Sequence, residues 1–312
     1  MPLNPKFENF LKGDFDGLYS LGVDKMREWY AKSWDDFKEN TEAVGFVSNL
    51  AVKTSLRDTP IRIYYPKTEK NFYPAFIWIH GGGFVLGNIE VYDSICRKIT
   101  NNVHCAVISI DYGLAPEHKF PEPVEECYQV VKWISDNAHA GELKIDPWRI
   151  AIGGDSVGGN LSAVISRLAR ERREFTLVYQ VMINAVFDLL GKTKPISRVV
   201  NAKGYRLTAK GNEWFMRQYL NDFSEAENPL ASPLLAENFK NLPAACIITS
   251  EYDLLRDEGE HYARRLSESG VEVCLKRYDG MIHGFFNMQS TLEASRDALA
   301  LVCKNLKAVF NN

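Results

Sequence analysis

Residues 154–159 read GDSVGG, directly after the apolar run RIAI (149–152) and directly before a stretch with helical spacing. A strand, a G-x-S-x-G pentapeptide and a helix in this order form a nucleophile elbow, a sharp turn that raises a serine above a sheet. The flanking glycines are required because a Cβ there would collide with neighbouring backbone. The pattern predicts that Ser156 is a nucleophile at a helix N-terminus, where the helix dipole favours developing negative charge. A chance glycine–serine turn before a helix is the alternative.

A second glycine-rich motif, HGGGF at residues 80–84, follows the apolar run AFIWI at 75–79. It matches the HGGG-type loop whose backbone amides bind the oxyanion in acyl-transfer reactions. Consecutive glycines let the backbone approach a substrate oxygen closely. A merely flexible turn would not explain why the run begins with a histidine at the end of a strand. The two motifs together favour nucleophilic catalysis over a chance turn.

A serine hydroxyl needs a general base, and that base needs an acid to orient it. In folds with a nucleophile elbow the chain order is serine, acid, histidine, with the last two on loops after successive strands. His283 follows the run VEVCLKRYDGMI (271–282), as this order requires. His261 also follows the elbow, but the helical stretch around it indicates a surface histidine. We therefore expect His283 to be the base.

Three carboxylates compete for the role of the orienting acid: Glu251, Asp253 and Asp257. Asp253 directly follows the run ACIITSEY (245–252), whereas Asp257 lies where a helix is expected to begin and a carboxylate would cap it. We favour Asp253 as the acid. Glu251 and Asp257 would then have supporting or capping roles.

Runs of β-branched and aromatic residues, bounded by turn residues, recur from Val44 onwards and indicate strands. There are eight of them: 44–52, 61–65, 75–80, 105–110, 149–154, 178–186, 245–250 and 271–278. Apolar residues at three-to-four spacing indicate helices around 124–134 and 161–168. Strands that alternate with helices predict the α/β class, with a mostly parallel eight-stranded sheet and helices on both faces.

The composition excludes some partners. The 312 residues include 37 basic and 40 acidic side chains, a net charge of −3 that is too balanced for a nucleic-acid partner. No run reaches the ~20 apolar residues of a membrane span, and the N-terminal residues do not resemble a secretory signal. We therefore expect a cytoplasmic protein. No Cys/His cluster has metal-site spacing, so we expect neither metal nor organic cofactor.

Two segments depart from the alternation of strands and helices. Residues 1–43 combine bulky aromatics with charges and contain no strand-like run, which predicts short covering helices. Residues 188 to about 240 combine a loop-like part with a polar-aromatic helix. We expect 1–43 to form N-terminal cap helices and 44–312 to form the catalytic domain, with a cap insert at about 188–240.

Five ordered motifs together resemble a known family. They are HGGGF at 80–84, DYGLAPEHKFP at 111–121, GDSVGG at 154–159, DLLRDEG at 253–259 and GMIHGF at 280–285. The chain resembles the hormone-sensitive-lipase-like branch of the α/β hydrolases, which includes the bacterial family IV esterases and relatives of arylacetamide deacetylase. The resemblance covers roughly residues 44–312.

The resemblance implies a site, a cap and an assembly. The implied catalytic triad is Ser156, Asp253 and His283. The implied oxyanion hole consists of the amides of Gly82, Gly83 and Val157. The aromatic N-terminal segment and the 188–240 insert would fold together over the acyl pocket, and residues 111–121 would be scaffolding near the glycine loop. A homodimer is also an expectation from the resemblance.

Three positions depart from the pattern of these relatives. Val157 stands where alanine is usual after the nucleophile, and its β-branched side chain would narrow the acyl pocket. Gly113 replaces an arginine and Leu254 replaces a proline, so both loops lose a residue that would make them rigid. None of the three changes removes a reacting group.

These motifs together predict a carboxylic-ester hydrolase that forms an acyl-enzyme intermediate on small to medium acyl esters. An amidase or deacetylase with the same triad is an open alternative, because the sequence does not distinguish the two. A non-catalytic small-molecule receptor is the alternative from another class. Receptors on this branch have lost the triad histidine, and the presence of His283 argues against that role.

Overall fold

A single eight-stranded sheet forms the centre of the molecule in the computed structural model, which describes residues 2–8, 10–34 and 41–311. The strands are β1 (Phe46–Lys53), β2 (Asp58–Tyr65), β3 (Tyr73–Ile79), β4 (Ala106–Ile110), β5 (Ile145–Asp155), β6 (Tyr179–Ile183), β7 (Ala244–Tyr252) and β8 (Val273–Ile282). Their order is β1-β2-β4-β3-β5-β6-β7-β8. β2 pairs antiparallel with both of its neighbours, β1 and β4, and the pairs from β4 to β8 are parallel. The eight predicted strands and the mostly parallel sheet are confirmed.

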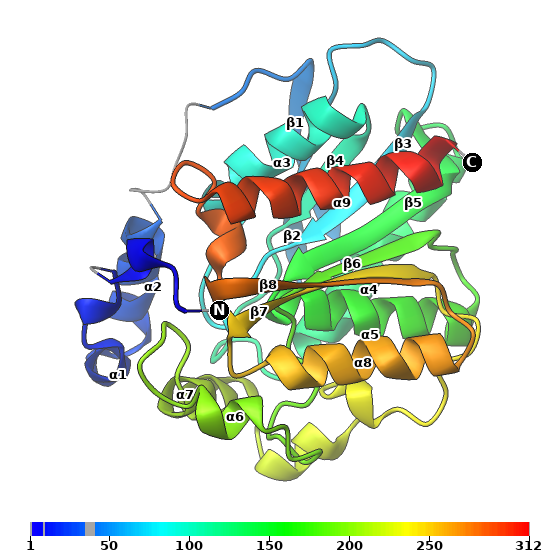
Figure 1. Cartoon of the computed structure of the whole chain (residues 1–312). Helices are drawn as coiled ribbons and strands as arrows, with labels where there is room; N and C mark the ends of the chain where they lie inside the picture. Colours follow the sequence, from blue (N-terminus) through cyan, green and yellow to red (C-terminus); the bar gives the residue numbers. More distant parts are fainter. Residues whose placement is uncertain (1, 9, 35–40, 312) are drawn as a thin grey trace.

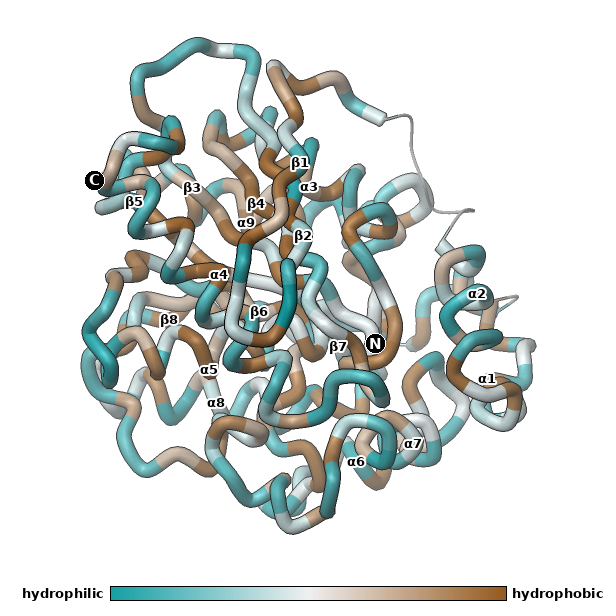
Figure 2. Tube along the Cα trace, turned by 180° about the vertical axis from the view of Figure 1, so that it is seen from behind, coloured by the Kyte–Doolittle hydropathy of each residue, from teal (hydrophilic) through white to brown (hydrophobic). Residues whose placement is uncertain are grey.

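The burial of the strands follows their positions in the sheet. Every residue of β3, β4 and β6 is buried, and these three strands have nearly continuous apolar sequences. A strand that is covered on both faces needs apolar side chains at successive positions. By contrast, β1 at the edge is largely exposed. Figure 2 shows hydrophobic residues concentrated on the central strands and on the helix faces that pack against them.

Helices cover both faces of the sheet, as predicted. One side carries α3 (Ile89–Val103) and α9 (Glu293–Asn311), and the other carries α4 (Glu122–His139), α5 (Val157–Arg172) and α8 (Arg256–Glu268) (Figure 1). The periodic stretches around 124–134 and 161–168 lie within α4 and α5. Among the described helices, none is both long and apolar enough to cross a membrane.

Two groups of short helices lie side by side at one end of the sheet (Figure 1). The N-terminal group comprises η1 (Pro5–Phe7), η2 (Phe10–Lys12), α1 (Phe15–Leu18), η3 (Tyr19–Leu21) and α2 (Val23–Ser33). The second group comprises α6 (Ser197–Val200) and α7 (Ala209–Tyr219). Two short helices follow in the chain, η5 (Phe223–Glu227) and η6 (Pro233–Leu235), of which η6 packs against α5 and α8. The predicted cap segment 1–43 includes residues 1, 9 and 35–40, which lie outside the described part of the chain.

Direct contacts join these two groups. The Thr208 hydroxyl donates to Asp16 at 2.6 Å, and the Tyr19 ring packs against Trp214 and Phe215 with centroids 5.6 and 5.9 Å apart. Segments that are far apart in the sequence therefore pack against each other at the end of the sheet where the glycine-rich loops lie.

Candidate active site

Ser156 lies at the turn between β5 and α5, as the G-x-S-x-G pattern predicts. Its backbone has φ +52°, a left-handed value that is rare for residues other than glycine. The Ser156 amide donates to the Ile183 carbonyl at 2.8 Å, which fixes the turn against β6. A Cβ at Gly154 or Gly158 would overlap the carbonyl oxygen of Ile79. The turn therefore requires glycine on both sides, and it stores backbone strain at the serine.

Ser156, His283 and Asp253 form one hydrogen-bonded chain. The imidazole Nε2 of His283 lies 3.2 Å from the Ser156 Oγ, and its Nδ1 lies 2.8 Å from an Asp253 carboxylate oxygen. The Asp253 side chain is fully buried, and that of His283 is 13% exposed. The serine oxygen is thus within hydrogen-bond distance of an imidazole whose other nitrogen is held by a carboxylate, a geometry that can activate a serine hydroxyl.

The other two candidate acids have partners elsewhere. Asp257 accepts hydrogen bonds from the Ser197 amide at 2.7 Å and from the Arg256 guanidinium at 2.7 Å. Glu251 accepts from the Gly280 amide at 2.7 Å. Among the three carboxylates it is Asp253 that contacts His283, while His261 lies on α8, away from this chain of side chains.

Two donors orient the Asp253 carboxylate, and one of them was not identified from the sequence. The Leu255 amide donates to one oxygen at 2.9 Å, and the Asn184 side-chain amide donates to the other at 3.0 Å. Asn184 is itself held at φ +46° and donates to the Ser250 hydroxyl at 2.8 Å. The sequence did contain a signal for Asn184. It is a polar residue directly after the apolar strand β6, and Asp253 directly follows the neighbouring strand β7.

The glycine-rich loop after β3 has a backbone that only glycine adopts readily. Gly82 has φ +121° and Gly83 has φ +66°. A Cβ would overlap the Leu86 carbonyl at the first position and the Phe215 ring at the second. In the described part of the chain neither amide donates a hydrogen bond to the protein. Both glycines line the same pocket as Ser156.

The His80 side chain packs against this loop and holds it through a hydrogen bond to the Gly81 carbonyl. Its ring is fully buried and stacks on Tyr112, with centroids 4.4 Å apart, while its Nδ1 donates to the Gly81 carbonyl at 2.8 Å. Burial lowers the pKa of His80, which favours the neutral ring. The Tyr112 hydroxyl donates to the His80 carbonyl at 3.1 Å. The segment 111–121 therefore packs against the glycine loop as scaffolding, as predicted.

Hydrogen bonds from other segments hold the two loops that contain Gly113 and Leu254. The Gly113 amide donates to Glu126 at 2.8 Å, and the same carboxylate pairs with Arg57 at 2.7 Å. The Leu254 carbonyl accepts from the Ser197 hydroxyl at 2.8 Å, which connects the acid loop to α6. Both departures from the family pattern are thus accompanied by hydrogen bonds from segments distant in the sequence.

Asp155, the residue before Ser156, is a second buried carboxylate at the site, and its role was not identified from the sequence. It accepts hydrogen bonds from the Gly81 amide at 2.9 Å and from the Tyr92 hydroxyl at 3.2 Å. Burial raises the pKa of Asp155 to about 6, while the nearby His283 and the hydrogen-bond donors oppose the shift. Asp155 therefore connects the nucleophile elbow to the glycine loop.

The raised pKa of Asp155 predicts a pH-dependent contribution to stability. The folded state holds the proton more tightly than the unfolded chain, so this contribution is fully present below about pH 4 and is lost as the pH rises through about 6. Asn at this position mimics the protonated acid. The free energy of unfolding of the wild type, relative to Asp155→Asn, should fall by about 3 kcal/mol in total from well below pH 4 to well above pH 6, and about 2 kcal/mol of this fall lies between pH 4 and pH 6. Denaturant titrations of both proteins measure this difference, and a difference that stays constant with pH would contradict the assignment.

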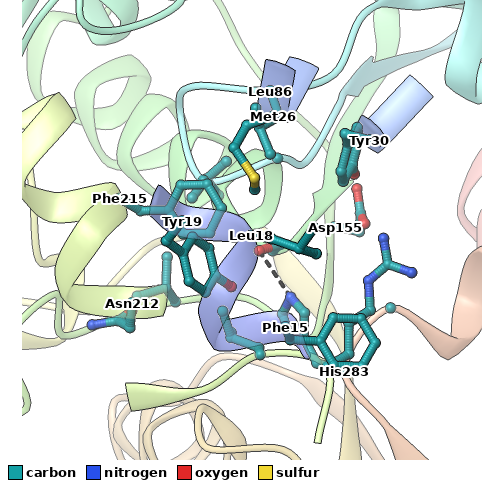
Figure 3. A pocket seen from close by; sticks show the side chains of 18 of the residues that line it. Phe15, Leu18, Tyr19, Met26, Tyr30, Leu86, Asp155, Asn212, Phe215 and His283 are labelled. Carbon is teal, nitrogen blue, oxygen red and sulfur yellow. Dashed lines mark hydrogen bonds between the residues drawn. The ribbon is translucent and has the colours of Figure 1, made fainter. Parts of the chain in front are cut away.

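An apolar pocket opens above the serine. It encloses about 780 Å³ between protein atoms, its open mouth included. Figure 3 shows Tyr19 and Phe215 on the opposite side of the pocket from Tyr30 and Asp155. The walls come from the two groups of short helices, and the floor includes Ser156 and His283. A substrate in this pocket would have the serine and the glycine loop beneath it.

A serine on a strand–helix elbow, bonded to a histidine and beside a glycine loop on a mostly parallel sheet, is the arrangement of an α/β hydrolase. Residues 76–287 match the family described as alpha/beta hydrolase fold. The chain belongs to this family. Esterase relatives, described next, further show that it lies on the hormone-sensitive-lipase-like branch and is a carboxylic ester hydrolase of the serine carboxylesterase type.

Similar proteins cover the whole chain. Arylesterase from Saccharolobus solfataricus is 38% identical over 320 residues, spanning 99% of this chain and 100% of that protein. Ethyl acetate hydrolase from Pseudomonas putida is 31% identical and spans 98% of this chain and 99% of its own. The solved structure of a hyperthermophilic esterase from the archaeon Pyrobaculum calidifontis superimposes with a TM-score of 0.92 at 40% identity, covering 99% of each chain.

Proposed function

We propose that the protein hydrolyses carboxylic esters through a covalent acyl-enzyme on Ser156, with His283 as general base and acid and Asp253 as the orienting carboxylate. The observation that carries the proposal is the unbroken chain of hydrogen bonds from Ser156 to His283 to Asp253. The strained backbone of Ser156 supports it, because such strain is retained where a function requires it.

In the first half-reaction, His283 Nε2 takes the proton of the Ser156 hydroxyl while the oxygen attacks the ester carbonyl carbon. The carbonyl oxygen becomes an oxyanion, which the amides of Gly82, Gly83 and Val157 stabilise in this proposal. One such donor is worth about 10²–10³ in kcat in related chemistry. Asp253 stabilises the imidazolium and keeps the neutral ring protonated at Nδ1. His283 then gives its proton to the leaving alcohol as the ester C–O bond breaks.

In the second half-reaction, His283 takes a proton from water, and the resulting hydroxide attacks the acyl carbon. A second oxyanion forms in the same hole. His283 returns the proton to the Ser156 oxygen as the acyl–oxygen bond breaks, which releases the carboxylic acid. Both steps balance in protons, and they use the same three side chains.

We further propose that the N-terminal helices and the insert at about 188–240 act together as a cap over the acyl pocket. Residues of α1, α2 and α7 line the walls above Ser156, which supports this role. A bounded apolar pocket would accommodate small to medium acyl chains and exclude long ones.

The acyl preference provides the experiment that tests the proposed function. Across p-nitrophenyl esters from acetate to laurate, we expect the highest kcat/KM among the short and medium chains and a decline towards laurate. Matched p-nitroanilides should react more slowly, because a poorer leaving group must be expelled. Anilides cleaved as fast as the esters would instead favour the amidase alternative, and no cleavage of any ester would refute the proposal.

Val157→Ala should widen the pocket beside the oxyanion amides. The Val157 side chain is 3% exposed and lines the pocket. Because removing methyl groups from a pocket wall changes discrimination by about tenfold or more, we expect kcat/KM for branched or longer acyl groups to rise about tenfold relative to acetate. The ratio is measured with the same ester series. An unchanged chain-length preference would show that Val157 does not narrow the acyl pocket.

A further inference from the structure

The pocket above Ser156 contains a buried arginine that the mechanism does not use. Arg206 lies in the loop between α6 and α7, is 8% exposed, and lines the same pocket as Ser156 and His283. Its side chain passes close to the reacting groups, because its Cδ lies 3.9 Å from where a Cβ would stand on Gly284, the residue after His283. No other arginine or lysine among the described residues lines this pocket.

Aromatic rings surround the Arg206 guanidinium. Its central carbon lies 4.0 Å from the ring centroid of Trp34, and three further rings lie between 5.4 and 5.9 Å away: Phe10, Trp29 and Tyr30. Rings attract a cation through their quadrupoles but do not neutralise its charge. The enclosure therefore positions the guanidinium without giving it a counter-ion.

The guanidinium is also short of hydrogen-bond acceptors. Its Nη2 donates to the Ser33 hydroxyl over a long 3.4 Å, and its Nη1 has no partner among the described residues. Burial lowers the pKa of Arg206, and the negative charge of Asp155 opposes this lowering. That carboxylate, however, already accepts from the Gly81 amide and the Tyr92 hydroxyl, and in the described part of the chain it forms no ion pair with Arg206.

Two other arginines show what is missing at Arg206, although the side chain of Arg198 is 14% exposed and that of Arg57 is 31% exposed. Arg198 pairs with the fully buried Glu258 at 2.8 Å, and Arg57 pairs with the fully buried Glu126 at 2.7 Å. A cation removed from water without a partner is costly, so buried charges are normally paired. Burial lowers the pKa of Arg206, but an arginine keeps its charge in neutral solution. Among the described residues no carboxylate pairs with this positive charge, which lies in the same pocket as Ser156.

We propose that Arg206 binds an ionised carboxylate carried by the substrate, so that the preferred substrates are esters with a second, free carboxylate, such as monoesters of dicarboxylic acids. The inference rests on the proposed ester hydrolysis and adds a substrate class to it. A planar guanidinium binds a carboxylate through two parallel hydrogen bonds. Arg206 is the one arginine or lysine among the described residues that line this mostly apolar, aromatic pocket, and a single such cation matches one negative charge at the end of an apolar chain.

Monoethyl esters of glutarate, adipate and suberate, compared with the ethyl ester monoamides of the same acids, test the proposal. Each pair has the same length and differs only in the charge of the remote group. For at least one chain length, the wild type should hydrolyse the acid with a kcat/KM at least about tenfold above that of the amide, as a charged hydrogen-bonded pair requires. Arg206→Gln should lower this acid-to-amide ratio at least about tenfold, mainly through KM. Arg206→Lys should give an intermediate ratio, because lysine keeps the charge but loses the two-pronged geometry.

Arg217→Gln is the matched control, since it removes one positive charge from the exposed side of α7, where Arg217 pairs with Glu213. It should keep the wild-type ratio. Equal loss of activity on acids and amides in Arg206→Gln would show a structural clamp and overturn the proposal. A wild-type ratio at or below one for all three lengths would overturn it without any variant. A wild type that hydrolyses no ester, p-nitrophenyl acetate included, would instead refute the proposed function on which this inference rests.

Discussion

Ser156→Ala is expected to lower kcat by about 10⁴–10⁶ while the protein stays folded. The hydroxyl is the attacking atom in the proposed reaction, and its hydrogen bond is to His283. Its removal leaves the glycine loop and the pocket intact, so the small residual rate would come from binding and the oxyanion amides alone. Steady-state kinetics on p-nitrophenyl acetate measure the loss, and circular dichroism and the Tm report on the fold.

Ser166→Ala provides the matched control for this substitution. Ser166 is a buried serine of the same helix α5, and its hydroxyl donates to the Ser162 carbonyl at 2.8 Å. It should retain near-wild-type kcat. If Ser156→Ala kept more than about one-hundredth of the wild-type rate, another group would have to be the nucleophile.

Asp253→Asn should lower kcat by about 10⁴, the second-largest effect we expect. The carboxylate oxygen that faces His283 also accepts from Asn184, so both neighbours donate to it. An asparagine NH₂ placed there would leave two donors facing each other, and an asparagine oxygen would carry no full charge to stabilise the imidazolium. With the NH₂ facing the ring, Nδ1 would have to accept, and the ring would adopt the tautomer that cannot accept the serine proton.

Asp257→Asn distinguishes the catalytic acid from its competitor in the sequence. Asp257 contacts Arg256 and the Ser197 amide, so its loss should change kcat less than about tenfold, mainly through the packing of α6. The reverse result, a large loss with Asp257→Asn and a small one with Asp253→Asn, would show that Asp257 and not Asp253 is the catalytic acid. Kinetics of the two variants side by side, each with its Tm, decide between these outcomes.

The sequence was sufficient to predict the sheet and the position of the strand–helix elbow that carries Ser156, for a local reason. Strands buried on both faces need continuous apolar runs, and the elbow after β5 tolerates only glycine at Gly154 and Gly158. Both requirements act on neighbouring residues, so they can be read directly from the amino-acid sequence. The order of serine, acid and histidine then restricted the search to loops after two later strands.

The sequence did not predict the roles of Asn184, Asp155 and Arg206, because these roles depend on contacts between distant segments. Asn184 orients the acid only because β6 and β7 are neighbours in the sheet, and Asp155 connects two loops that are separated in the chain by two helices and two strands, α3, β4, α4 and β5. Arg206 looks like an ordinary loop arginine until the N-terminal aromatics enclose it. No periodicity or spacing in the sequence predicts which side chain will lie opposite another across a pocket.

Labelling with a p-nitrophenyl phosphonate ester tests the central claim most directly, because a phosphonate attached to the nucleophile does not undergo the second half-reaction. Mass spectrometry of the protein and of its peptides locates the adduct. We predict one phosphonyl group per chain, on Ser156, formed in step with the loss of esterase activity and absent in Ser156→Ala. Loss of activity with Ser156 unmodified, or an adduct on another residue that forms equally in Ser156→Ala, would contradict the account.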